Sequence, residues 1–125
     1  MRYIIALYFI SFISSASTCM TSDKQIALWN EKYVSLFKVS TEKNNNSFNV
    51  QVSLPNNIEG KIFKAVWLVV GDDNDPSFIA PLSTYEEDSK TKVWFVVKPN
   101  NNDKNVLIFS YGEGCGISVD VPIEL

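Results

Sequence analysis

Residues 48–54, with the sequence FNVQVSL, decide the fold class. Apolar side chains occupy every second position and polar ones lie between them, which is the period of a β-strand with one buried and one solvated face. Pro55 follows directly and ends the strand, because proline has no backbone N–H to donate to a sheet ladder. The segment therefore predicts a half-buried strand whose wet face carries Asn49, Gln51 and Ser53.

The next apolar segment, residues 62–70 (IFKAVWLVV), is rich in β-branched side chains. Such a run is typical of a central strand that is buried on both faces. Because Trp67 lies within this most apolar strand, we expect it in the core. Residues 78–82 form a shorter apolar run that contains Pro81, so we expect them at the edge of a sheet.

Three more alternating segments follow, at residues 92–98, 106–111 and 117–123. In the first of them Val93, Phe95 and Val97 should face inward. Trp94 then lies on the opposite face, where it is either exposed or in contact with a second layer. These segments extend the β pattern to the end of the chain.

The N-terminal part of the domain is less regular. Residues 33–40 read as a strand, whereas residues 25–30 (QIALWN) fit either an edge strand or a helical turn. Polar runs at 42–47 and 86–89 predict turns. Because the 3.6-residue period of a helix does not persist, we expect no substantial helix. The whole pattern predicts an all-β fold, an immunoglobulin-like antiparallel β-sandwich of about seven strands.

The first 18 residues have the three-part pattern of a secretory signal peptide. Arg2 is the basic start, an apolar stretch follows, and small residues precede the expected cleavage site. A membrane anchor is the alternative, but it needs about 20 apolar residues and the stretch is shorter. A lipoprotein signal is a second alternative because Cys19 comes next, although Thr18 before it is larger than such signals use. We expect a periplasmic or extracellular protein, not inserted in a membrane, with one domain at residues 19–125.

The net charge limits the classes of partner that we expect, and the cysteines limit the chemistry. The chain has 11 basic and 14 acidic residues, a net charge of −3, and cleavage removes Arg2 to leave −4. An acidic surface disfavours nucleic acids and anionic membranes and favours a basic partner. Cys19 and Cys115 are expected to form a disulfide, as thiols usually do in an oxidising compartment. A reactive thiol is the alternative, but no basic residue lies near Cys115 in the sequence.

The chain contains no histidine. This excludes histidine-based triads, histidine zinc sites and the usual near-neutral general base. The acids at 72–75 and 86–88 lie in predicted turns, where nothing would raise a carboxyl pKa for glycosidase chemistry. The spacing at 72–75 departs from the twelve-residue calcium loop, so we predict no metal site, although cation binding there stays open. We expect no enzymatic activity and no cofactor.

These exclusions leave a binding protein. Our first hypothesis is an inhibitor or immunity protein that blocks the cleft of a toxin or a cell-wall hydrolase. Such targets are often basic, so acidic loops would steer the partner and an aromatic side chain would anchor it. The residues expected to contact the partner are acids and aromatics of predicted turns together with one strand tryptophan: Asp72, Asp73, Asp75, Tyr85, Glu86, Glu87, Asp88 and Trp94.

Two alternatives remain. The three tryptophans, Trp29, Trp67 and Trp94, can stack on sugar rings where they are exposed, which would make the chain a carbohydrate-binding module. A surface-fibre or fimbrial subunit would instead have an incompletely paired edge strand that another chain completes.

Overall fold

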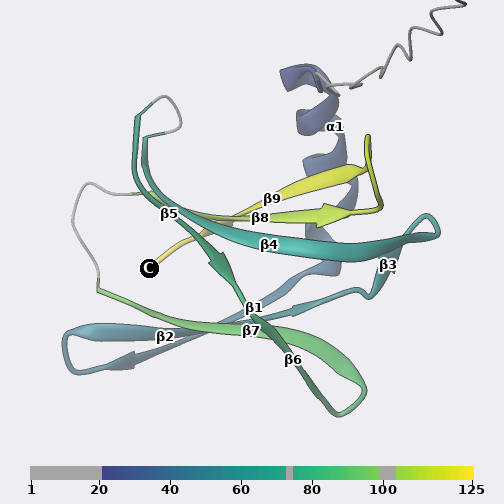
Figure 1. The fold of residues 1–125 in the computed structure, drawn as a ribbon. Coiled ribbons are helices and arrows are strands. Elements are labelled where there is room, and N and C mark those ends of the chain that lie inside the picture. The colour runs from purple at the N-terminus through teal and green to yellow at the C-terminus, as the bar shows by residue number, and fades with distance from the viewer. Residues whose placement is uncertain (1–20, 73–74, 99–103) are drawn as a thin grey trace, which may run out of the picture.

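In the part of the chain that the structure describes, two antiparallel β-sheets pack face to face beside one short helix (Figure 1). The computed structural model describes residues 21–72, 75–98 and 104–125. The expected signal peptide and Cys19 lie outside the described residues. The predicted all-β sandwich is confirmed.

The smaller sheet has four strands in the order β1-β2-β7-β6. In that order, the strands are Lys38–Asn44, Ser47–Leu54, Lys90–Val97 and Thr84–Glu87. The strand predicted at residues 48–54 is therefore β2, and its wet face belongs to the outside of this sheet.

The larger sheet has five strands, in the order β3-β4-β8-β9 with β5 paired to β4. These strands are β3 Asn57–Ile58, β4 Lys61–Asp72, β5 Asp75–Leu82, β8 Asn105–Tyr111 and β9 Ile117–Ile123. If the two-residue β3 is set aside, β1-β2-β7-β6 and β5-β4-β8-β9 follow the A-B-E-D and C′-C-F-G orders of the immunoglobulin fold. The pairing of β5 with β4 alone agrees with the edge position expected from Pro81.

The core lies between the two sheets and is built by the alternating residues that the sequence indicates. Val93 and Phe95 of β7 are buried, as predicted, and so are the inward residues of β2, β8 and β9. Phe37 completes the core from the β1 side, with its ring centroid 4.5 Å from that of Phe109. Tyr111 is fully buried and donates a hydrogen bond to the carbonyl oxygen of Pro55 at 2.8 Å, and burial raises the pKa of its hydroxyl.

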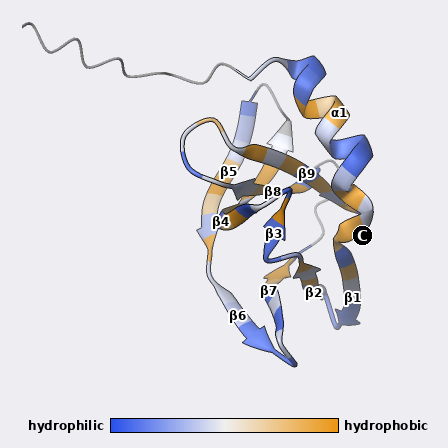
Figure 2. Cartoon of the chain, turned by 90° about the vertical axis from the view of Figure 1, so that its right-hand side faces the viewer, coloured by the Kyte–Doolittle hydropathy of each residue, from blue (hydrophilic) through white to orange (hydrophobic). Residues whose placement is uncertain are grey.

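The prediction that no substantial helix exists is wrong. Helix α1 spans Asp23–Tyr33, and the side chain of Ser22 caps it by accepting a hydrogen bond from the backbone N–H of Gln25 at 3.2 Å. Trp29 and Tyr33, four residues apart on one side of the helix, pack against the core. The rest of the helix mixes hydrophilic and hydrophobic residues (Figure 2), and the apolar Leu28 is 52% exposed, so the apolar residues do not mark a single buried face in the sequence.

The strand predicted at residues 33–40 is also wrong at its start. Tyr33 ends α1, a 3₁₀ turn occupies Val34–Leu36, and β1 begins only at Lys38. The apolar residues of this segment alternate as they would in a strand. In the structure they lead the chain from the helix into the core. Residues 25–30, which fit either a strand or a helical turn in the sequence, are helical.

The placement of Trp67 in the core is wrong as well, because β4 is buried on one face only and a β-bulge turns Trp67 to the other face. Phe63 and Tyr111 are partners across β4 and β8, but Ala65, two residues on, pairs with Ser110, so Lys64 is an extra residue. The bulge reverses the alternation, so that Val66 and Leu68 face the core and Trp67 faces out, 41% exposed. Strand β4 is thus central in the sheet but buried on only one face.

The two polar runs form tighter turns than predicted. Residues 42–44 belong to β1 and residues 86–87 to β6, so the turns themselves are only two residues long. In the second turn Asp88 and Ser89 both have positive φ, at 54° and 64°. Two positive φ values match the twist of a two-residue hairpin, so β6 and β7 pair directly on either side of the turn.

Candidate functional site

The eight residues expected to bind a partner fall at opposite ends of the sandwich. Asp72 ends β4 and pairs with Asp75 at the start of β5, and Asp73 lies outside the described residues. This end of the β4–β5 hairpin lies at the upper left of Figure 1, whereas the β6–β7 turn lies at the lower right. The two acidic segments therefore do not form one surface.

The other five residues share the β6–β7 hairpin. Tyr85, Glu86 and Glu87 lie on β6, Asp88 is in the turn and Trp94 is on β7. The placement of Glu86 and Glu87 in a turn is corrected, because both pair with β7 as strand residues. The hairpin therefore brings together one acidic segment and both predicted aromatic contacts.

Tyr85 and Trp94 lie on the same outer face of the four-stranded sheet. Trp94 is opposite Gln51 of β2, and Tyr85 is opposite Lys92 of β7. Both of these β7 residues point away from the core, because Val93 between them is fully buried. Trp94 is 54% exposed and Tyr85 is 37% exposed, so the two aromatic side chains are accessible from one side.

A hydrogen bond fixes Tyr85 across the sheet. The Nε2 atom of Gln51 donates to the hydroxyl oxygen of Tyr85 at 2.6 Å. Since β7 lies between β6 and β2, the tyrosine side chain must cross β7 beside Trp94 to reach Gln51. The hydroxyl accepts in this bond, so its own proton remains available for an acceptor on a ligand.

Polar side chains surround the aromatic pair. The register places Lys38, Ser53, Lys92 and Tyr85 in one row across the four strands, and Ser40, Gln51 and Trp94 in the next row. A shallow hollow of about 240 Å³ opens in this face. Its lining is largely basic and hydroxylic: Lys38, Ser40, Gln51, Ser53, Asp88, Lys90 and Lys92.

The acids of the hairpin are balanced by these lysines. The Nζ atom of Lys92 lies 3.5 Å from the Oε1 atom of Glu87, and the Lys92 side chain is only 17% exposed. Asp88 lines the hollow together with Lys90. The face that holds the aromatic side chains is therefore mixed in charge, in contrast to the acidic loop that the sequence suggested.

The outer face of the five-stranded sheet differs in composition. Two rows that run across its strands from β5 to β9 are mainly apolar: Pro81, Trp67, Ile108 and Asp120, and Ile79, Val69, Val106 and Pro122. A groove of about 500 Å³ separates this face from α1. The backbone N–H of Asp120 donates to the Oδ1 atom of Asn30 at 2.7 Å, which attaches the helix at the β9 edge.

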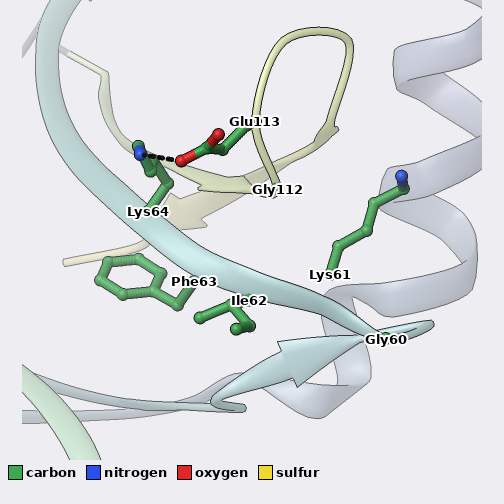
Figure 3. Close-up of a pocket in the computed structure, with 7 residues that line it drawn as sticks. All are labelled: Gly60, Lys61, Ile62, Phe63, Lys64, Gly112 and Glu113. Carbon is green, nitrogen blue, oxygen red and sulfur yellow. Dashed lines mark hydrogen bonds and ion pairs between the residues drawn. The ribbon is translucent and has the colours of Figure 1, made fainter.

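Another hollow, of about 460 Å³, lies at the start of β4 (Figure 3). Lys64 and Glu113 form an ion pair across it, with 3.1 Å between Nζ and Oε1. Lys61 extends in a different direction, towards α1, so the two lysines do not converge. This hollow therefore does not form a binding site for an anion.

Strand β1 has the free edge that a fibre subunit would need, since among the described residues it pairs only with β2 and all seven of its residues are exposed. Lys38, Glu42 and Lys43 put charges along it. Charges of this kind are the usual protection of a sheet edge against pairing with another chain. The edge therefore gives the fibre alternative no specific support.

The described residues contain no group of three or more acidic, histidine or cysteine side chains arranged to hold a metal ion. Within the same ranges, no helix has the length and apolar character needed to cross a membrane. Cys115, in the loop between β8 and β9, is not a free thiol. Its pairing with Cys19 stays a prediction, because Cys19 lies outside the described residues.

Sequence reasoning missed Gln51 and the three lysines of the hollow. The alternation of β2 did place Gln51 on a wet face, but nothing in the sequence showed that β7 would be its neighbour. Lys38, Lys90 and Lys92 come from strands more than 50 residues apart in the chain, and only the sheet register brings them together.

No family model matches the chain, and no curated protein and no solved structure matches it at a significant level.

Proposed function

We propose that this chain is a non-catalytic saccharide-binding protein that contacts its ligand with the outer face of the four-stranded sheet. The observation that carries the proposal is the pair Tyr85 and Trp94, exposed on one face and joined through Gln51. Export by the expected signal peptide, which would bring the protein to extracellular or cell-wall saccharides, belongs to the same proposal.

The chemistry of the face suits a polyhydroxylated ring. The C–H groups of a pyranose carry partial positive charge and are attracted to the electron-rich face of an aromatic ring such as Trp94. The hydroxyl groups of a sugar need directional donors and acceptors, which Gln51, Ser40 and Ser53 provide. Both kinds of contact are available within two adjacent rows of the sheet.

The composition of the face favours a saccharide over a protein. Lysine and serine are depleted in protein–protein interfaces, and charged side chains are rare at their centres. On this face lysines and serines surround the aromatic pair. The Tyr85–Gln51 bond also holds the tyrosine in place before a ligand arrives, which lowers the entropy cost of binding.

Affinity electrophoresis through gels that contain soluble polysaccharides, neutral and acidic, tests the proposal. At least one polysaccharide should retard the protein. Trp94→Ala should weaken that retardation roughly tenfold, because the lost aromatic contact contributes on the order of 1–2 kcal/mol. Trp94→Ala should destabilise the fold no more than Trp67→Ala does, because Trp94 is the more exposed of the two tryptophans.

Trp67→Ala is the matched control, because it removes an exposed tryptophan from the opposite outer face. It should leave the retardation unchanged. If no polysaccharide retards the protein, or if Trp94→Ala binds as well as the native protein, the saccharide proposal fails.

A protein partner is the second candidate, and two observations favour it. Trp67, Ile79 and Ile108 form an apolar surface on the five-stranded sheet, which is the composition that protein interfaces bury. Asp75 lies on the same sheet, at the start of β5, and its charge suits the basic toxin or hydrolase that the acidic sequence suggests. An inhibitor would then use the five-stranded sheet.

Capture of secreted proteins from the native source on the immobilised protein tests this candidate. A basic partner should bind the native protein and Trp94→Ala equally but lose affinity for Trp67→Ala. Its association should slow between about 50 and 500 mM salt, because the Debye length shrinks several-fold. Capture that depends on Trp94 and not on Trp67 would reject the five-stranded sheet as the interface.

A further inference from the structure

The geometry points to an acidic saccharide, one whose ring stacks on Trp94 while its carboxylate enters the lysine-lined hollow beside it. This inference rests on the proposed saccharide-binding function and names the class of sugar. The hollow of about 240 Å³ is large enough for the acid group of one sugar residue and its hydration, and too small for a chain segment.

Three ammonium groups gather at this hollow. Lys38 comes from β1, and Lys90 and Lys92 come from β7, on a chain whose net charge is −3. Lys92 is held by Glu87. Neither Lys38 nor Lys90 forms an ion pair with another described residue, so both charges are available to an anion.

The nearby carboxylates do not cancel this charge. Glu87 and Asp88 are the two acids beside the three lysines, which leaves one net positive charge at the hollow. In an acidic protein, a local excess of positive charge marks where an anionic group is bound most favourably. Ser40 and Ser53 add hydroxyl donors to the same lining.

The hollow is contiguous with the aromatic pair. Gln51 lines it, bonds Tyr85 and lies opposite Trp94, so one side chain touches both parts of the site. Lys92 precedes Trp94 by two residues on the same face, a distance of about 7 Å along a strand. A pyranose ring and its exocyclic carboxylate span about that distance, so one uronic acid residue stacked on Trp94 places its carboxylate at the Lys92 side of the hollow, which Lys38 and Lys90 also line.

Nuclear magnetic resonance titration of the ¹⁵N-labelled protein with glucuronate, glucose and acetate tests the inference. Both sugars should shift the Trp94 indole signal, but only glucuronate should also shift the amides of Lys38, Ser53 and Lys90. Glucuronate should bind about fivefold more tightly than glucose, an effect of the size expected for two solvent-exposed charge contacts. Acetate alone should bind more weakly than glucuronate, because it lacks the ring.

The double variant Lys38→Gln/Lys90→Gln should remove the preference for glucuronate and leave glucose binding unchanged. Lys24→Gln/Lys43→Gln, which removes two exposed lysines away from the hollow, should keep the preference. Equal affinity for glucuronate and glucose, or a preference that survives Lys38→Gln/Lys90→Gln, would overturn the acidic-saccharide inference and leave the proposed function standing. Acetate binding as tight as glucuronate binding would overturn it too, as an anion site without saccharide recognition. If neither sugar shifts the Trp94 indole, the acidic-saccharide inference fails, and the retardation of the protein by polysaccharides alone decides the proposed function.

Discussion

The two outer faces of the sandwich each carry one exposed tryptophan, yet their surroundings differ. Around Trp94, on the four-stranded sheet, the neighbours are an amide, hydroxyls and lysines, with one exposed apolar side chain, Val96. Around Trp67, on the five-stranded sheet, the neighbours are Pro81 and Ile108. An exposed aromatic ring is therefore not a site by itself, since the polar groups around it decide which class of ligand it can hold.

The strands of both sheets also have an inner side, which faces the core. There, the burial of a side chain decides how much it contributes to stability. On β4, Leu68 is 7% exposed and Trp67, its chain neighbour, is 41% exposed. A larger side chain is thus the less buried of the two. The bulge at Lys64 decides which parity of the strand faces the core, and the opposite face leaves Trp67 exposed.

The largest expected effect concerns this inner–outer pair. Leu68→Ala should lower the free energy of unfolding by about 2–5 kcal/mol, since it leaves a cavity between the sheets. Trp67→Ala should cost only about 1–2 kcal/mol, although it removes more atoms, because much of the ring is in water. Chemical denaturation of both variants measures the difference. If Trp67→Ala lowers the free energy of unfolding more than Leu68→Ala does, Trp67 lies in the core. That result would contradict the β-bulge.

A smaller effect, on saccharide affinity, is expected when one hydroxyl group is removed from the outer face of the four-stranded sheet. Tyr85→Phe removes the hydroxyl that accepts from Gln51 and keeps the ring. Saccharide affinity should fall about three- to tenfold, the loss of one hydrogen bond of roughly 0.5–1.5 kcal/mol, and stability should change little. Tyr33→Phe, which alters a tyrosine on the helix, should leave affinity unchanged. Full affinity in Tyr85→Phe would show that the hydroxyl does not contact the ligand.

The smallest expected effect on stability concerns an ion pair that attaches α1 to the five-stranded sheet. Lys32 donates to Glu59 at 2.8 Å, and this bond, with a second one from Tyr33, holds the pKa of the Glu59 carboxyl below its ordinary 4.5. A lowered native pKa means that the contribution is complete above pH 4.5 and is lost as the pH falls through the native value. The pair is exposed, so its contribution is small.

Thermal unfolding of Glu59→Gln and the native protein between about pH 3 and pH 7 measures this contribution. The variant should melt slightly lower at neutral pH, and the gap should close at acidic pH. Glu124→Gln, at an exposed position near the C-terminus, should show no such trend. A gap that widens as the pH falls would contradict the assigned role of Glu59.

Much of the fold follows from the sequence because strand alternation is a local property. The inward sets of β2, β7, β8 and β9 were predictable, since each strand has one wet face and keeps a regular period. Strand β4 was not predictable in the same way. It is apolar on both sides, so no polar residue marked the outer face and no signal revealed the bulge at Lys64.

The helix and the binding face were harder for different reasons. In α1 only Trp29 and Tyr33 reach the core from one side, which gives too few apolar positions for a period. The binding face depends on register: Trp94 was identified, but its contact row includes Gln51, more than 40 residues away. Pairing between distant strands sets such a row, and the sequence of either strand alone does not contain it.

The central claim is that the four-stranded sheet, and not the five-stranded one, holds the saccharide. The indole N–H signals of Trp67 and Trp94, assigned with the two alanine variants, report on the two faces in one spectrum of the ¹⁵N-labelled protein. Titration with a polysaccharide oligomer that retards the protein in gels should shift the Trp94 signal and leave the Trp67 signal in place. A shift of Trp67 with Trp94 unmoved would contradict the account and assign the ligand to the apolar face.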